Sequence, residues 1–575
     1  MQITNKINFR NLQGDMFGGL TAAVVSLPMA LAFGVASGAG PVAGLYGAVC
    51  VGFFAALFGG TPTLISEPTG PMTVVFTAIV TKMIADNGEE TGLAMAFTVV
   101  MLAGAFQILF GFLRLGKYIT LMPYTVISGF MSGIGMIMII LQLGPFLGHK
   151  SPSGGVIGML KSLPEFLTNI NLPETILASM TVAIIFFMPS KFKRIVPPQL
   201  LALILGTVVS LVIFIPAGVE IRIIGEIPMG LPELQLPVFS PGQIQLMVID
   251  GLVLGMLGCI DSLLTSVVAD SLTRYNHDSD KELIGQGIGN IVSGLCGGLP
   301  GAGATMGTVV NIQTGARTAV SGITRALILL TVVLYAAALT KNIPMAVLAG
   351  IALKVGIDII DWSFLKRAHK VSLKGALIMY GVILLTVFVD LIVAVGVGVF
   401  IANILTIQNL SDVQSQDVKA ITDADDKIIW SDEEKRLLEE ANNRILLFYL
   451  SGPMIFGVSK AIAREQSVVE NYDILILDLT DVPLLGVTSS LAIENAIKDA
   501  VDKGRAVFIV GAAGKILKRL QKFGILELIP PQNLITQRVE ALRQAVALLN
   551  QYETANGSTG KNIPINLNAD TAFRN

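Results

Sequence analysis

The sequence predicts a polytopic α-helical membrane protein of about fourteen spans, followed by a soluble C-terminal α/β domain. The 575-residue chain is 53% hydrophobic and only 14% charged, and its mean hydropathy is +0.71. A soluble protein carries more charge than this. Runs of roughly 20 apolar residues, the length that crosses a bilayer, recur up to residue 409. After Leu410 the composition becomes acidic, and no later run is long enough to span.

The composition also excludes several classes of protein. The formal net charge is −2 and no basic stripe with interleaved aromatic residues occurs, so nucleic acid is not an expected partner. Cys50, Cys259 and Cys296 lie apart in apolar stretches and predict neither disulfides nor a zinc site. The stretch "GAAGKILKRL" lacks the spacing of a nucleotide-binding loop and the three histidines are dispersed, so we do not expect an enzyme.

Hydropathy divides the first 410 residues into consecutive spans. The polar N-terminus lacks the features of a cleaved signal peptide, so the first apolar run is expected to remain as a helix. The run at 304–316 is too polar to be identified by hydropathy alone and is counted as a short half-span. The other spans lie near 16–36, 41–60, 69–85, 93–112, 122–147, 175–190, 197–216, 246–271, 282–299, 319–338, 343–360, 374–388 and 390–409.

Loop charge sets the orientation, because Lys and Arg accumulate in short cytoplasmic loops. With a cytoplasmic N-terminus, the inner loops receive Arg114, Lys117, Lys191, Lys193, Arg194, Arg274, Lys281, Arg317, Lys366, Arg367, Lys370 and Lys374. The outer loops receive only Lys82, Lys150, Lys161, Arg222 and Lys341. The sequence therefore predicts a protein of the plasma membrane, embedded in the lipid bilayer, with both termini in the cytoplasm.

The C-terminal region predicts a small α/β domain at 438–551, behind an acidic linker at 411–437 and before a disordered tail at 552–575. Short apolar stretches predict buried strands in "RILLFYLSG", "YDILILDLTD" and "RAVFIVGA". Amphipathic stretches predict helices in "GVSKAIAREQSVVE", "SSLAIENAIKDAVDK" and "ITQRVEALRQAVALLNQ".

Two of the membrane spans are interrupted by Gly and Pro. The stretch "GLPGAGATMGTVVNIQTGART" begins at Gly298, and "ISEPTGPMTVV" begins at Ile65. Irregular backbone at membrane depth is tolerated only inside protein or beside a water-filled cavity, and transporters use such breaks to aim helix N-termini at a substrate. The interrupted spans are third and tenth in order, as expected for two inverted repeats of seven spans at about 16–216 and 246–409. The alternative is that each is an ordinary loop.

The two breaks together predict a site for a small anion. N–H groups at the start of a helix are unpaired and carry about half a positive charge, so two such ends can hold an anion without Lys or Arg. Neither break contains a basic residue before Arg317. The candidate anion-binding residues are Thr69, Gly70, Gly303, Ala304 and Thr305.

Asp261, in the middle of the eighth span, is the strongest single candidate, because a carboxylate inside a membrane is costly and usually functional. It must either be protonated or meet a cation. Thr265 lies on the same helix face, and with Thr305 or Thr308 and nearby carbonyls it forms an all-oxygen set suited to Na⁺. The candidate Na⁺ ligands are Asp261, Thr265, Gly303, Ala304 and Thr305. If Asp261 is protonated instead, it is a proton-coupling site.

Several ordered motifs resemble the SulP family of anion transporters. These are "GLTAAVVSLPMALAFGVASGAGPVAGLYGAV", "DSLLTSVVAD" and "GTVVNIQTGARTAVSGI", while "LDLTDVPLLGVTSS" resembles the C-terminal STAS domain of that family. The resemblance covers nearly the whole chain. It implies a transport domain at 1–410 with two inverted seven-span repeats arranged as a core and a gate, anion binding between the third and tenth segments, a STAS domain at 438–551 and a homodimer.

Within the family the chain is most similar to the sodium-dependent bicarbonate transporters of cyanobacteria. Met29 stands where many members have Gln, and Met306-Gly307 stands where many have Ser-Arg. The missing arginine removes a fixed positive charge beside the anion, which Na⁺ near Asp261 would offset. The resemblance implies import of bicarbonate with Na⁺ by an elevator-type movement. The alternatives are a proton-coupled sulfate or dicarboxylate carrier, and a membrane-anchored STAS sensor or scaffold.

Thr488 occupies the place of a phosphoacceptor in the STAS motif, although the preceding Asp is absent here. A phosphate at a helix N-terminus is stabilised by the unpaired N–H groups. Thr488 is therefore a candidate regulatory phosphorylation site, through which a partner of the STAS domain would act. The other interpretation is that Thr488 or Ser489 simply caps the helix.

Overall fold

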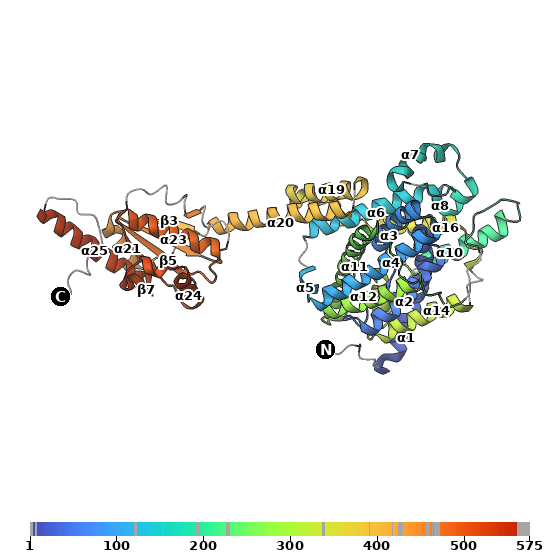
Figure 1. The fold of residues 1–575 in the computed structure, drawn as a ribbon, viewed down its shortest axis with the longest axis horizontal. Coiled ribbons are helices and arrows are strands. Elements are labelled where there is room, and N and C mark those ends of the chain that lie inside the picture. Colours follow the sequence, from blue (N-terminus) through green and yellow to red (C-terminus); the bar gives the residue numbers. More distant parts are fainter. Residues whose placement is uncertain are drawn as a thin grey trace. The chain divides into compact units, whose positions relative to one another are not determined.

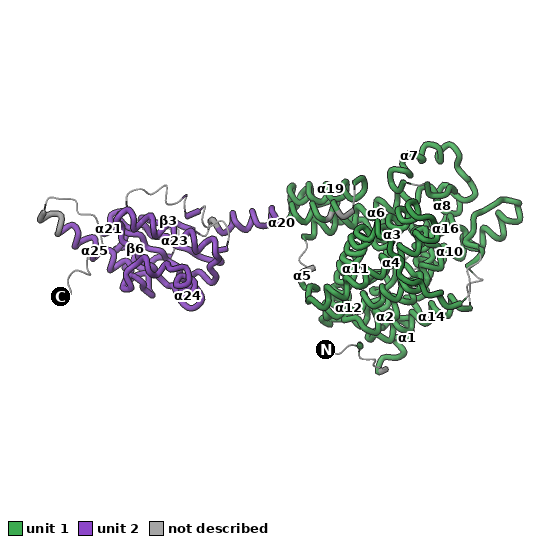
Figure 2. The backbone as a smooth tube through the Cα atoms, viewed as in Figure 1, with its two compact units in different colours: residues 1–402 green, residues 403–575 purple. Residues whose placement is uncertain are grey.

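The computed structural model divides the chain into two compact units. They comprise residues 1–402 and residues 403–575 (Figure 2). The structure describes residues 4–5, 9–119, 123–152, 154–189, 192, 196–225, 230–335, 340–389, 391–416, 418–423, 429–455, 461–462, 464 and 472–559.

A helix lies in each of the fourteen predicted spans (Figure 1). These helices are α1 (Leu12–Ala36), α2 (Pro41–Phe58), α3 (Gly70–Asn87), α4 (Glu89–Phe112), α6 (Tyr124–Phe146), α8 (Leu172–Phe187), α10 (Pro198–Val209), α11 (Ile244–Thr273), α12 (Ser279–Leu295), α13 (Thr305–Gln313), α14 (Val320–Tyr335), α16 (Met345–Ile359), α19 (Leu373–Phe388) and α20 (Leu391–Gln416). Six described helices are long and apolar enough to cross a membrane by themselves. The others are shorter or more polar.

Helix α7 (Gly155–Thr168) is absent from the predicted spans. It has only 14 residues, fewer than the roughly 20 that cross a bilayer, and it contains Lys161, Pro164 and Glu165. The helix packs against α6 and α19, and it meets α8 at a bend of 114°. Three short helices, α5 (Gly116–Ile119), α17 (Trp362–Leu365) and α18 (Ala368–Val371), lie in connections between the spans.

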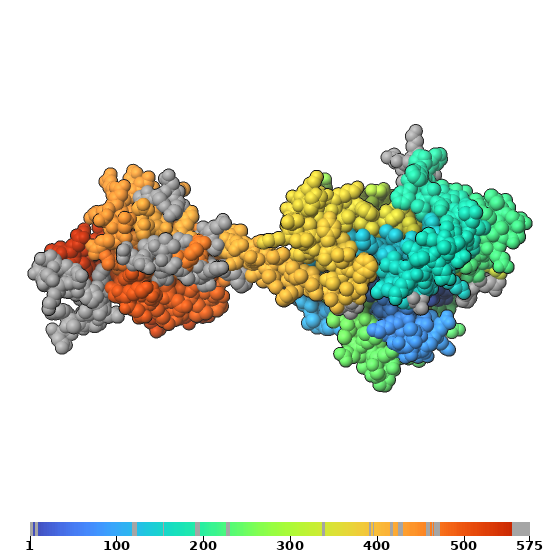
Figure 3. Space-filling view, turned by 90° about the horizontal axis from the view of Figure 1, so that it is seen from above, coloured from blue at the N-terminus to red at the C-terminus, as the bar shows by residue number. Residues whose placement is uncertain are grey.

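The long helices of the first unit pack as two groups, and each group takes helices from both halves of the chain. In the group that we name the core, α12 packs against α2 and α4, α11 against α4, and α14 against α1 and α2. In the group that we name the gate, α16 packs against α6 and α8, and α10 against α8. Figure 3 shows this mixing on one face, where the teal segment that includes α7 lies beside the yellow segment that includes α19. Such interleaving is what two inverted repeats produce.

The two interrupted spans meet in the core at a short antiparallel pair of strands. β1 (Ser66–Glu67) pairs with β2 (Ala302–Gly303), so that Ser66 lies opposite Gly303 and Glu67 opposite Ala302. Helices α3 and α13 begin within three residues of these strands. The pairing satisfies backbone N–H and C=O groups that would otherwise be unbonded at membrane depth. Because the strands are antiparallel, the starts of α3 and α13 lie at opposite ends of this pair.

The second unit is a five-stranded sheet covered by helices on both faces. Its strands lie in the order β3 (Val418–Ile421), β4 (Ile445–Ser451), β5 (Ile474–Asp481), β6 (Ala506–Val510) and β7 (Leu534–Ile535). β4 to β7 are parallel, and β3 is antiparallel to β4. The helices α23 (Val487–Asp502) and α24 (Gly514–Lys522) cover one face, while α21 (Asp432–Ala441) and α25 (Arg538–Thr559) cover the other.

The α/β prediction corresponds to β4, β5, β6, α23 and α25. The helix predicted at 457–470 lies largely outside the described residues. The stretch predicted as an acidic linker, 411–437, contains the end of α20, all of β3 and the start of α21. β3 belongs to the folded unit because Val418 and Ile421 are buried in it. Helix α25 continues to Thr559, inside the predicted tail, and residues 560–575 lie outside the description.

Candidate ion-binding site

Helix α11 carries two polar side chains past the β1–β2 pair. Asp261 and Thr265 are one helical turn apart and both are buried. Thr69, the residue just before α3, donates a hydrogen bond of 2.7 Å from its hydroxyl to Oδ2 of Asp261. In the part of the chain that the structure describes, Asp261 forms no ion pair with Lys or Arg. The membrane interior therefore holds a carboxylate supported by a neutral donor.

One turn further along α11, Thr265 contacts the start of α13. Its hydroxyl donates to the carbonyl oxygen of Gly303 at 2.9 Å, and it lies 2.9 Å from the Thr305 hydroxyl. Five of the predicted residues thus fall into two contacting sets: Thr69 with Asp261, and Thr265 with Gly303 and Thr305. The prediction left Thr305 and Thr308 open, and the contact with Thr265 is made by Thr305. The Thr308 hydroxyl instead accepts a bond of 3.0 Å from the Ile65 N–H.

The predicted backbone donors are not all free. The N–H of Gly303 donates to the Ser262 hydroxyl at 3.0 Å, and the N–H of Ala304 donates to the Ile65 carbonyl at 2.8 Å. The expectation that these two N–H groups are free for an anion is therefore wrong, because Ser262 of α11 and Ile65, the residue before β1, already accept their hydrogen bonds. Helix geometry leaves the N–H groups of the first turn of α13, at Thr305 to Gly307, without an intrahelical acceptor. Thr305 and Met306 are also exposed.

The start of α3 is more enclosed than that of α13. Gly70 is buried, and a Cβ atom at this position would lie 2.2 Å from Cδ1 of Ile359 on α16. A larger residue at this position would have to displace the Ile359 side chain, so glycine favours the close approach of the core to the gate. The predicted residue Gly70 has this packing role whether or not its N–H also contacts an anion.

Sequence analysis missed a buried ion pair between α14 and β1. Arg325 of α14 is fully buried and binds Glu67 of β1, the Ser66 and Ala48 carbonyls and the Ser26 hydroxyl. The criterion that identified Asp261, an ionisable residue inside a predicted span, also applies to Arg325 and could have found it.

A second missed group ties α12 to the same strands. Glu282 accepts hydrogen bonds of 2.8 Å from the N–H groups of Gly60 and Thr61 and from Gln286. The Gln286 amide also donates to the Ser66 hydroxyl at 2.6 Å. These buried groups fix the strands on which the candidate site depends.

The candidate phosphorylation site, Thr488, lies in the second unit. It is exposed in the first turn of α23. The N-cap of this helix is Gly486, and the helix has no side-chain cap. The interpretation of Thr488 or Ser489 as the cap is therefore wrong, since glycine occupies that position.

Comparison with known proteins identifies the family. The profile described as "Sulfate permease family" matches residues 12–382, and the STAS domain profile matches residues 437–541. The chain belongs to the sulfate permease family. This result confirms the resemblance to SulP transporters and the predicted fold class of a polytopic helical membrane protein with a C-terminal STAS domain.

The relatives are similar over nearly their whole length. The chain is 66% identical over 547 residues to the bicarbonate transporter BicA of Picosynechococcus, covering 95% of this chain and 97% of the relative. It is 65% identical over 563 residues to BicA of Synechocystis, covering 98% and 99%. The solved transmembrane domain of a cyanobacterial BicA is 70% identical with a TM-score of 0.64, covering 69% of this chain and all of that domain. These relatives are named as transporters, which confirms the prediction that the chain is not an enzyme.

Proposed function

We propose that this chain is a secondary active transporter that imports bicarbonate together with Na⁺. The observation that carries the proposal is the buried Asp261 carboxylate at the starts of α3 and α13, linked to Thr69 and lacking a cationic partner among the described residues. A scaffold has no need of such a charge. The choice of bicarbonate is supported by the two relatives at 66% and 65% identity that are named bicarbonate transporters.

Na⁺ would bind among the oxygen atoms around Asp261. A hard cation prefers carboxylate, hydroxyl and carbonyl ligands. The contacts at Thr265 bring the Gly303 carbonyl and the Thr305 hydroxyl to the same helix face as Asp261. The proposed ligands are therefore Asp261, Thr265, Gly303 and Thr305, with Ala304 adjoining them. Thr69, bonded to the carboxylate, orients it.

Bicarbonate would bind at the helix starts. The first turn of α13, in which Thr305 and Met306 are exposed and Gly307 is buried, supplies unpaired N–H groups and the positive end of the helix dipole. Thr69 and Gly70 supply the opposing end at α3. Thr305 borders both sites, so Na⁺ would strengthen the local positive potential where Met306 provides none. This proximity gives coupling a physical basis.

Coupling also removes an electrical penalty. Bringing one negative charge into a cell costs roughly 2.3 kcal/mol at 100 mV, negative inside, and a Na⁺ carried with a monovalent anion cancels this term. The Na⁺ gradient then drives uptake. Because the proposed ligands all belong to the core, movement of the core against the gate would carry both ions, as in an elevator.

The proposal also covers the location, the assembly and the regulation of the protein. The plasma membrane is the proposed location, with both termini cytoplasmic as the loop charges predict. A homodimer is the proposed assembly. Thr488 is proposed as a regulatory phosphorylation site of the STAS domain, where a regulatory partner would act.

The test is uptake of labelled bicarbonate into proteoliposomes, with and without an inward Na⁺ gradient at equal pH on both sides. Protein-free vesicles correct for diffusion of CO₂, and sulfate and a dicarboxylate are measured in parallel. We expect uptake that requires Na⁺ and prefers bicarbonate. Uptake driven by a pH gradient without Na⁺, or a preference for sulfate, would support the proton-coupled alternative. No uptake of any anion would support the sensor or scaffold.

A further inference from the structure

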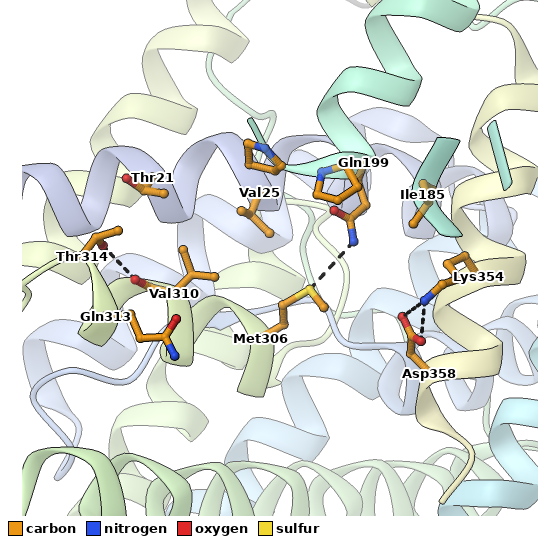
Figure 4. Close-up of a pocket in the computed structure, with 12 residues that line it drawn as sticks. Thr21, Val25, Ile185, Gln199, Met306, Val310, Gln313, Thr314, Lys354 and Asp358 are labelled. Atoms are coloured by element: carbon orange, nitrogen blue, oxygen red, sulfur yellow. Dashed lines mark hydrogen bonds and ion pairs between the residues drawn. The ribbon is translucent and has the colours of Figure 1, made fainter. Parts of the chain in front are cut away.

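A cavity of about 480 Å³ lies where the core meets the gate (Figure 4). The core contributes side chains of α1 and α13, including Met306 and Val310, and the gate contributes side chains of α8, α10 and α16. Its polar lining includes Gln199, Lys354 and Asp358. The cavity therefore lies between the two groups of helices whose relative movement would carry the ions.

The cavity reaches the proposed anion site through Met306. Met306 is the second residue of α13 and is 46% exposed, and its Sδ lies 3.8 Å from Nε2 of Gln199. None of the polar residues proposed to hold the ions lines the cavity itself. The space thus adjoins the proposed anion site, which it meets at Met306.

Lys354 is the basic residue among the side chains that line this cavity. Its ammonium group lies 2.5 Å from both carboxylate oxygens of Asp358, one turn further along α16. It also lies 4.8 Å from the centre of the Phe186 ring. The Lys354 side chain is 12% exposed and that of Asp358 is 42% exposed, so the carboxylate is the more accessible partner. Figure 4 shows this pair across from Met306 and Gln199.

We propose that the cavity is the vestibule through which the anion reaches α13, and that Lys354 is its capture residue. The ligand class is a small monovalent oxyanion, and the inference rests on the proposed function. The ammonium group attracts the anion into the cavity, exchanging part of its contact with Asp358 for contact with the anion. Asp358 limits the strength of this capture, so that the anion is released toward the first turn of α13.

The proposal predicts opposite effects for the two members of the pair. Lys354→Gln removes the attraction and leaves the Asp358 charge to repel the anion, so the KM for bicarbonate should rise about tenfold at low salt. Asp358→Asn leaves the ammonium group unopposed and should lower the KM by about threefold. Lys354→Arg keeps the charge and should keep the KM within about twofold. In each case kcat should change less than KM.

The experiment measures initial uptake rates against bicarbonate concentration in proteoliposomes at saturating Na⁺ and two ionic strengths. The dependence of kcat/KM on salt should weaken in Lys354→Gln, because screening acts on the removed charge. Lys498→Gln is the control, since Lys498 forms an exposed pair of the same spacing with Glu494 in the second unit. This control should behave as the native protein does.

A purely structural role of the pair gives a different result. Both single substitutions would then impair transport in the same direction, with no change in salt dependence, and the proposal would be overturned. Equal KM values in all variants would overturn it too. These failures are distinguishable from failure of the proposed function, because that function is decided by whether the native protein transports bicarbonate with Na⁺ at all.

Chemical modification tests whether a positive charge at position 354 is what lowers the KM. In a chain with Cys50, Cys259 and Cys296 replaced by Ala, Lys354→Cys is modified with a cationic or an anionic thiosulfonate of similar size. The cationic adduct should restore the low KM, and the anionic adduct should raise it further. Equal effects of the two adducts would contradict the proposal.

Discussion

Arg325 and Glu67 form an ion pair although both side chains are buried inside the membrane unit. The same guanidinium group also donates to the Ser66 carbonyl. Arg325 thereby donates hydrogen bonds both to the Glu67 carboxylate and to the backbone of β1. Since β1 holds β2 in register, the position of Gly303 in the candidate site depends on Arg325.

Removing this arginine should destabilise the protein strongly. Arg325→Met leaves the Glu67 carboxylate buried and unpaired, and we expect a loss of about 3–5 kcal/mol in the free energy of unfolding. The double variant Glu67→Gln/Arg325→Met should recover part of this loss. Thermal unfolding in detergent provides the measurement. Arg543→Met, in an exposed pair with Glu433, is the control and should change stability by less than about 1 kcal/mol. A single variant as stable as this control would contradict the interpretation.

Thr69 should control the affinity for Na⁺ through its bond to Asp261. A hydrogen bond to a charged group is worth about 1.5–3 kcal/mol, so Thr69→Val should raise the Na⁺ concentration for half-maximal uptake at least about tenfold. Thr69→Ser keeps the hydroxyl and should stay close to the native value. Thr81→Val is a suitable control, because the exposed Thr81 hydroxyl donates to the Thr77 carbonyl of its own helix. Unchanged Na⁺ dependence in Thr69→Val would count against the site.

Asp361 should make stability depend on pH in the acidic range. Burial acts to raise the pKa of Asp361, but hydrogen bonds from the Phe364 N–H, Tyr124 and Ser128 outweigh it and lower the pKa below its ordinary value. A lowered pKa stabilises the folded state above the pKa of the unfolded chain, and this stability is lost as pH falls through the folded value. The Tm of the native protein should therefore exceed that of Asp361→Asn at pH 7. The difference should shrink below about pH 4, and a difference that stays constant across this range would refute the assignment.

The STAS unit has its own buried charge pair. Arg538 donates to the Asp478 carboxylate at 2.5 Å, and Asp478 is fully buried within β5. Arg538→Ala should destabilise this unit by about 3 kcal/mol, because the carboxylate loses its cation. Hydrogen exchange of the β5 amides in the full chain measures the effect. Protection equal to the native level would show that the Thr480 hydrogen bonds suffice alone.

The sequence predicts the helices of the membrane unit well, because the bilayer imposes one length and one hydropathy on each span. It misses α7 because this helix has only 14 residues, with charged residues and Pro164 among them, and so lacks the roughly 20 apolar residues of a span. The interrupted spans are predictable because Gly and Pro mark them. The β1–β2 pair is not predictable in this way, since two strands of two residues each leave no periodic signal and pair across more than 230 positions.

Some residues of the candidate site could be predicted from the sequence and others could not. Asp261 and Thr265 follow from helical spacing and from the cost of burying a carboxylate. The roles of Gly303 and Ala304 could not be assigned correctly, because their N–H groups are used by Ser262 and Ile65, which are distant in sequence. Lys354 could not be predicted as a functional residue, because the cavity that it lines is formed by packing of α16 with α13 and α10. Residues whose role depends on tertiary contacts are the hardest to predict from the sequence.

The central claim is that one site at Asp261 couples Na⁺ to bicarbonate. The most direct measurement follows labelled Na⁺ and labelled bicarbonate simultaneously in the same proteoliposomes, for the native protein and for Asp261→Asn. The account predicts that each ion accelerates uptake of the other in the native protein, in a fixed ratio, and that Asp261→Asn loses this mutual acceleration. Native uptake of bicarbonate with no accompanying Na⁺, or full coupling in Asp261→Asn, would contradict it.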